Sequence, residues 1–131
     1  MNIIGNGVDI IKNKRIERSL KINGFKNRIF TKNEILQSKK IKNKTSFFAK
    51  RFAAKEAAAK ALGTGFRKGV YWKDLEVVNL PSGKPSINFY GNSKKQLESL
   101  IPRNNIPVVN LSITDEFPYA QAIVTINSNK V

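Results

Sequence analysis

The sequence predicts an α+β fold in which helices pack on a small, mostly antiparallel sheet, and two observations predict it. Before Gly65, apolar residues recur at helical spacing after one short N-terminal strand, whereas beyond Gly65 they follow the two-residue alternation of strands. Turn-forming segments at 81–85 and 115–118 then connect consecutive strands. Separate runs of helices and strands favour this architecture over an alternating α/β fold.

The N-terminal strand is expected over 2–11, because its residues alternate in character. One face carries three aliphatic residues: Ile4, Val8 and Ile10. The other face carries Gly5, Gly7 and Asp9. We expect the two glycines to leave space for a bulky ligand beside the Asp9 carboxylate. The alternative is an edge strand in which Asp9 only caps the next helix.

Two shorter helices are expected next. A basic helix follows at 12–20, with its apolar residues facing inward: Ile11, Ile16 and Leu20. Thr31 and Glu34 have the spacing of a capping box and open a helix that runs to about Lys40. The segment 39–44 reads as a basic linker.

A long helix is expected to begin at a cap on Thr45 or Ser46 and to run to Leu62, where Gly63 ends it. One row of side chains along it, four residues apart, contains Phe48, Phe52, Glu56 and Lys60. The neighbouring row is all alanine and lets another backbone approach closely: Ala49, Ala53, Ala57 and Ala61. Glu56 continues a line of two aromatic residues, so we expect it at the margin of the core, where a carboxylate needs a partner. The alternative is a simple ion pair between Glu56 and Lys60.

The second half is expected to contain four strands and a helix. The strands span 75–80, 86–90, 107–114 and 119–126, and the helix spans 93–100. Within the third strand, the inward residues are Val109, Leu111 and Ile113. We expect 1–131 to be one domain, because this length can bury a core, with a frayed tail over 127–131.

Composition excludes several kinds of chemistry. The chain has no cysteine and no histidine, so disulfides, thiolate metal sites, Ser-His-Asp triads and imidazole bases are absent. Carboxylates, lysines, hydroxyls and a hard, oxygen-preferring cation remain. No apolar run is long enough for a membrane span, and the N-terminus does not resemble a signal peptide, so we expect a cytoplasmic protein that does not bind membranes.

The net charge of +15, from 24 basic and 9 acidic residues, favours an acidic partner. The excess is mostly lysine, whose codons are A/T-rich, so genome composition is a competing explanation. A basic nucleic-acid-binding module would also explain the charge. However, the basic residues are dispersed and no RNA-binding aromatic signature accompanies them, so we expect no nucleic-acid partner.

Five motifs together resemble the holo-acyl-carrier-protein synthases, a family of 4′-phosphopantetheinyl transferases. The resemblance covers nearly the whole chain, in the family's order and at its spacing. The motifs are Gly7-Val8-Asp9 with Arg15, Phe52-Ala53-Ala54-Lys55-Glu56-Ala57, Lys60-Ala61-Leu62-Gly63-Thr64-Gly65, Gly83-Lys84-Pro85 and Leu111-Ser112-Ile113-Thr114. Each motif alone is weak, whereas the combination is highly specific.

This resemblance implies a magnesium-dependent transferase that supports fatty acid biosynthesis. In the family, a serine hydroxyl of apo-acyl carrier protein attacks the diphosphate of coenzyme A. The phosphopantetheine arm moves to the serine, and adenosine 3′,5′-bisphosphate leaves. The resemblance also implies a homotrimer with active sites at the subunit interfaces.

The resemblance further implies roles for particular residues. Asp9 and Glu56 match the Mg²⁺ ligands, and Lys60 matches a lysine that stabilises charge on the departing phosphate. Either Glu56 or a metal-bound water could take the serine proton, and the sequence leaves both open. The positions expected near coenzyme A are Arg51, Lys60, Gly83, Lys84, Pro85 and Thr114. The positions expected to dock the acidic carrier protein are Arg15, Arg18 and Lys21.

The chain departs from the family at Asp115, where a histidine usually donates to a phosphate of coenzyme A. An ionised carboxylate cannot donate and repels phosphate. Either Asp115 turns away while a nearby Lys or Ser substitutes, or coenzyme A binds more weakly. A catalytically weakened family member is therefore an alternative to the active enzyme.

Overall fold

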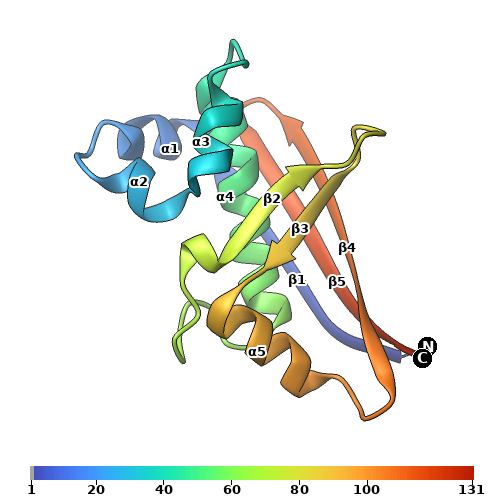
Figure 1. Cartoon of the computed structure of the whole chain (residues 1–131). Coiled ribbons are helices and arrows are strands. Elements are labelled where there is room, and N and C mark those ends of the chain that lie inside the picture. The colour runs from blue at the N-terminus through green and yellow to red at the C-terminus, as the bar shows by residue number, and fades with distance from the viewer. Residues whose placement is uncertain (1) are drawn as a thin grey trace.

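The computed structural model describes residues 2–131 and has the predicted α+β architecture (Figure 1). The strands are β1 (Asn2–Lys12), β2 (Leu75–Asn79), β3 (Pro85–Phe89), β4 (Asn105–Glu116) and β5 (Tyr119–Lys130). The helices are α1 (Asn13–Leu20), α2 (Phe25–Ile29), α3 (Lys32–Ser38), α4 (Lys44–Ala61) and α5 (Gly91–Leu100), with a 3₁₀ turn, η1, at Trp72–Asp74. The sequence patterns predicted neither the short helix α2 nor the turn η1.

Two antiparallel sheets enclose the long helix α4. The larger sheet has the order β1-β5-β4, and the smaller is the hairpin β2-β3. Figure 1 shows α4 running along one face of the larger sheet, with β2 and β3 crossing it from the other side; α4 contacts both sheets. Twelve residues of α4 are buried, so this helix forms the centre of the core.

The glycines of β1 have a different role from the one expected. Their face of the strand packs on α4, so that a Cβ atom added to Gly7 would overlap the carbonyl of Ala57, and one added to Gly5 would overlap that of Ala61. The helix backbone therefore fills the space that the sequence assigned to a bulky ligand. The alanine row does permit close approach, as predicted. Val8 and Ile10, on the opposite face, are exposed.

The ends of two elements also differ from the sequence prediction. The side chain of Asn43, not that of Thr45 or Ser46, caps α4 by accepting a hydrogen bond from the Ser46 amide at 3.0 Å. At the C-terminus, 127–131 is not frayed: β5 continues to Lys130, pairs with strands on both sides, and buries Asn127 and Ser128. Pairing on both edges satisfies backbone groups that would otherwise need water.

The predicted capping box of α3 and glycine end of α4 are both present. The Thr31 hydroxyl accepts from the Glu34 amide at 3.1 Å, and Gly63 has a φ of +81°. Within residues 2–131, none of the helices combines the length and apolar character that a bilayer crossing requires.

Candidate active site

The first cluster of predicted site residues lies where β1 meets the last turns of α4. The Lys60 ammonium donates to the Asp9 Oδ1 atom at 3.2 Å and to the Val8 carbonyl at 3.1 Å. The Lys60 side chain is 51% exposed and the Asp9 side chain 16% exposed. Asp9 therefore does not cap the following helix, whose N-terminus receives no side-chain hydrogen bond.

Glu56 belongs to the same cluster and is partly buried. Burial raises the pKa of its carboxyl group above the usual value of 4.5, and the negative charge of Asp9 raises it further, while Lys60 and Arg15 act in the opposite direction. The alternative of a Glu56–Lys60 ion pair is not realised. Among residues 2–131, the only ion pairs within 4.0 Å join Lys60 to Asp9 and Lys55 to Glu34.

This cluster fits a hard divalent cation. The two carboxylates lie close enough for the charge of Asp9 to raise the pKa of Glu56, and a cation between them would offset this repulsion. Mg²⁺ is often held by one or two carboxylates, with waters and substrate oxygens completing its shell. No group of three or more acidic side chains gathers anywhere in the part of the chain that the structure describes, so Asp9 and Glu56 would leave most positions to water and substrate.

The basic residues of α1 border the same cluster. Arg15 and Arg18 are exposed and line a shallow depression of about 350 Å³ together with Ile22. The Arg15 guanidinium lies 5.6 Å from the centre of the Phe52 ring, on the same helix as Glu56. Lys21 is exposed at the C-terminal end of α1. The three predicted docking residues are therefore all exposed on α1 or at its end, and Arg15 lies nearest to Glu56.

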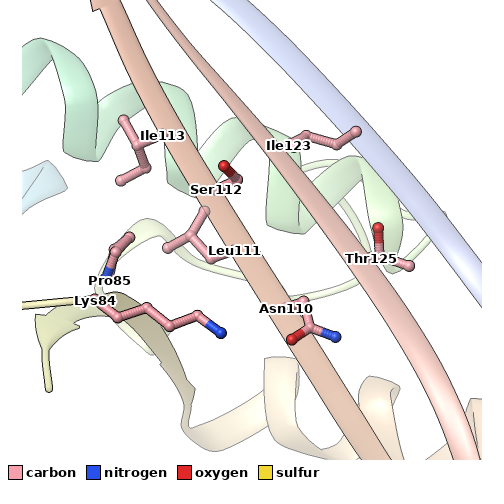
Figure 2. Close-up of a pocket in the computed structure, with 8 residues that line it drawn as sticks. All are labelled: Lys84, Pro85, Asn110, Leu111, Ser112, Ile113, Ile123 and Thr125. Carbon is pink, nitrogen blue, oxygen red and sulfur yellow. The ribbon is translucent and has the colours of Figure 1, made fainter. Parts of the chain in front are cut away.

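The second cluster lies where α4 passes the edge of β4 and the β2–β3 turn. A cavity of about 200 Å³ brings together three of the expected coenzyme A residues, Arg51, Gly83 and Pro85. Lys84 and Pro85 line a neighbouring cavity of about 410 Å³ that runs along β4 (Figure 2). Thr114 lines a separate hollow of about 170 Å³ with Gln121 and Ile123. Arg51, Gly83, Lys84 and Pro85 thus lie near one another, whereas Thr114 lines a different hollow and Lys60 belongs to the first cluster.

Arg51 is the most unusual residue of the second cluster. Its side chain is only 7% exposed, its guanidinium stacks 3.8 Å from the centre of the Phe47 ring, and its Nε atom has no hydrogen-bond partner within residues 2–131. Burial lowers its pKa, and the negative charge of Glu34 acts in the opposite direction. A buried guanidinium with an unused donor is suited to an anionic ligand.

Asp115 does not turn away from this cluster. Its carboxylate lines the cavity of Arg51, and its Oδ2 atom accepts a hydrogen bond from the Ser46 hydroxyl at 3.2 Å. Lys50 and Asn79 also line the cavity. The sequence patterns missed Ser46, Lys50 and Asn79, and only the position of Lys50 next to Arg51 could have indicated one of them.

The two clusters lie on different sides of α4. Arg51 and Glu56 are five residues apart, which separates them by about 7.5 Å along the axis and about 140° around it. None of Asp9, Glu56 and Lys60 lines the cavities described above. A single protomer therefore presents the carboxylates and the buried arginine in different directions.

Comparison with known proteins identifies the family. Residues 5–116 match the family model described as the 4′-phosphopantetheinyl transferase superfamily. The chain belongs to this superfamily. It is 47% identical over 131 residues to a holo-[acyl-carrier-protein] synthase of Chelativorans sp., covering 98% of both chains, and 48% identical over 128 residues to that of Brucella ovis, covering 96% of both.

Solved structures agree with this assignment. The holo-[acyl-carrier-protein] synthase of Neisseria meningitidis has a TM-score of 0.82 and 38% identity, covering 96% of this chain and 99% of that one. The synthase of Bacillus anthracis, described in complex with CoA (3′,5′-ADP), has a TM-score of 0.77 and 40% identity, covering 97% of this chain and 98% of that one. The fold and family expected from the sequence motifs are confirmed.

Proposed function

We propose that this protein is a magnesium-dependent holo-acyl-carrier-protein synthase. It moves the 4′-phosphopantetheine group from coenzyme A to a serine of apo-acyl carrier protein and thereby supports fatty acid biosynthesis in the cytoplasm. The observation that carries the proposal is the cluster of Asp9, Glu56 and Lys60 in a chain that matches holo-acyl-carrier-protein synthases over nearly its whole length.

In this reaction a bond forms between the serine oxygen and the phosphorus that carries pantetheine. The bond from that phosphorus to the bridging diphosphate oxygen breaks, and adenosine 3′,5′-bisphosphate leaves. Asp9 and Glu56 would hold Mg²⁺, which supplies positive charge to the diphosphate. Lys60, half exposed beside Asp9, would donate to the oxygen on which negative charge develops.

Either Glu56 or a water on the bound Mg²⁺ would accept the serine proton. Burial and the charge of Asp9 raise the pKa of the Glu56 carboxyl group, whereas a bound Mg²⁺ would act in the opposite direction. Arg15, Arg18 and Lys21 would hold the acidic carrier protein against α1, next to Glu56. This arrangement would deliver the serine to the carboxylate cluster.

The second cluster would bind the nucleotide end of coenzyme A. The unused Nε donor of Arg51 supports an anionic ligand there, and the neighbouring Lys84 adds positive charge. Gly83 has a φ of +90° and open space around its Cα atom, so the β2–β3 turn can approach a ligand closely. Pro85 and Thr114 would complete the binding surface.

A homotrimer would explain two features of the protomer. The outer face of the larger sheet leaves Val8, Ile10 and Ile123 exposed, which favours contact with another copy of the chain. The carboxylate cluster and the nucleotide cluster also face different ways, so contact between protomers could combine the two clusters of neighbouring copies into one interfacial site.

Mass spectrometry tests the proposed function. Purified protein is mixed with apo-acyl carrier protein, coenzyme A and Mg²⁺, and one added phosphopantetheine is expected, with none in the presence of a chelator. The Glu56→Gln variant should lose transfer while keeping its fold by circular dichroism, because it lacks the carboxylate. Glu98→Gln, on the exposed surface of α5, is the matched control and should remain active. Transfer that survives both chelation and Glu56→Gln contradicts the proposal.

A further inference from the structure

The cavity at the second cluster is lined by two cationic side chains and one carboxylate that do not form ion pairs with each other. Lys50, Arg51 and Asp115 all line its 200 Å³. Neither Lys50 nor Arg51 forms an ion pair with Asp115 within 4.0 Å. The carboxylate therefore remains an acceptor inside a basic cavity.

Asp115 is exposed, and one hydrogen bond orients its side chain. It lies near the end of β4, where it pairs with the buried Ala120 of β5. The Ser46 hydroxyl, in the first turn of α4, donates to its Oδ2 atom at 3.2 Å. Because Ser46 already gives its proton to Asp115, it is not free to donate to a phosphate at the same time. The hydroxyl thus holds the carboxylate in place instead of substituting for it.

The chemistry of this cavity suits a ligand with one anionic group and a neighbouring hydroxyl group. The Arg51 guanidinium favours the anion, and the Asp115 carboxylate accepts hydrogen bonds from hydroxyls. In dinucleotide-binding α/β folds, a carboxylate accepts from a free ribose hydroxyl of NAD, whereas a nearby arginine accommodates the ribose phosphate of NADP. The same carboxylate repels a phosphate at that ribose position.

We infer that Asp115 is a specificity-determining residue that faces the ribose 3′ position and accepts a hydrogen bond from the 3′-hydroxyl of a nucleotide that lacks the 3′-phosphate. This inference rests on the proposed binding of coenzyme A at the second cluster. It deepens that proposal by naming the substrate class: the enzyme uses 3′-dephospho-coenzyme A, which has a free 3′-hydroxyl, about as well as coenzyme A itself. The 3′-phosphate gives no advantage because Asp115 opposes the attraction of Lys50 and Arg51.

Isothermal titration calorimetry with adenosine 3′,5′-bisphosphate and adenosine 5′-phosphate tests this directly and needs no catalysis. The wild-type protein should bind the two nucleotides with dissociation constants within about tenfold of each other. Asp115→Asn should strengthen binding of the bisphosphate about tenfold or more relative to the monophosphate, since one like charge is removed. High salt should reduce this change.

Glu116→Gln is the matched control, because it removes the same charge one residue away, where the side chain is exposed and does not line the cavity. It should leave the ratio of the two dissociation constants unchanged. A wild-type preference for the bisphosphate above about a hundredfold, or an equal ratio in Asp115→Asn and wild type, overturns the inference.

Kinetics then separates this inference from the proposed function. The ratio of kcat/KM for coenzyme A over 3′-dephospho-coenzyme A should rise in Asp115→Asn, mainly through a lower KM for coenzyme A. Transfer from both substrates with an unchanged ratio supports the function and overturns the inference. Absence of transfer from both, with the expected shift in nucleotide binding, contradicts the function and leaves the role of Asp115 supported.

Discussion

Two lysines on α4, five residues apart, each contact a carboxylate, yet their surroundings differ completely. Lys55 lies 2.6 Å from the Glu34 Oε1 atom, and both side chains are fully buried. Lys60 lies 3.2 Å from Asp9 Oδ1, and both side chains reach solvent. The first pair is enclosed by protein, whereas the second borders the proposed site.

The buried pair has protein partners on every side. Lys55 also donates to the carbonyls of Ile29, at 2.8 Å, and Trp72, at 3.2 Å. Glu34 accepts from the amides of Thr31, at 2.8 Å, and Val77, at 3.0 Å. The pair therefore joins α4 to four other segments: α2, α3, η1 and β2. The buried pair, with hydrogen bonds to protein groups on both members, stabilises the fold. In the exposed pair, Lys60 or Asp9 can leave its partner and contact a ligand instead.

The largest effect is expected for Lys55→Met, which leaves Glu34 buried without its partner. Removing one member of a buried ion pair costs about 3–5 kcal/mol, so the free energy of unfolding in urea should fall by that amount. Adding Glu34→Gln should recover part of the loss, because no charge then remains buried.

Lys94→Met, on the exposed surface of α5, is the control and should change stability little. A loss below about 1 kcal/mol for Lys55→Met would show that the buried pair does not stabilise the fold.

Lys60→Met should show the reverse pattern. An exposed ion pair contributes about 0–1 kcal/mol, so the urea midpoint should change little. The rate of phosphopantetheine transfer should fall by about 10²–10³, as expected when one donor to a developing charge is lost. Full activity, or a stability loss equal to that of Lys55→Met, would mean that the two lysines do not differ as proposed.

The smallest change in stability is expected for Glu56→Gln. Unlike the two lysine variants, this variant should be more stable than the wild type, not less. The folded-state pKa of Glu56 is raised, so the folded protein binds the proton more tightly and loses stability as the pH rises from 4.5 through the raised pKa. Without divalent cations, the variant should therefore be more stable than the wild type at neutral pH. The difference should disappear as the pH falls to 4.5, the usual pKa of this group.

Thermal unfolding of both proteins over this pH range measures the effect. Equal stability of the two proteins at every pH would show that the surroundings of Glu56 do not destabilise its charged form.

Local patterns predicted most elements, because capping, helical spacing and alternation depend on neighbouring residues. The capping box of Thr31 and Glu34 is an example. The same patterns identified the glycine face of β1 but not what covers it, since the close packing of α4 is a contact between distant segments. The N-cap was placed wrongly because Asn43, Thr45 and Ser46 are all capable caps.

The site was predicted less completely than the fold. Spacing alone favoured a simple Glu56–Lys60 pair, and only the family motifs connected Asp9 to α4. Lys55 follows Phe52 by three residues on the buried side of the helix, which could have indicated a buried lysine, but its partner Glu34 could not be found locally. The contact of Ser46 with Asp115 spans 69 residues and has no sequence signal.

The close packing of Gly5 and Gly7 on α4 has a consequence for the chemistry. Because Gly5 and Gly7 have no side chain, β1 lies very close to α4. This short separation also determines how far the Asp9 carboxylate lies from that of Glu56. Any side chain at Gly7, however inert, would push the two proposed Mg²⁺ ligands, Asp9 and Glu56, apart. An alanine at position 7 would thus lower the transfer rate only by lengthening the distance between Asp9 and Glu56.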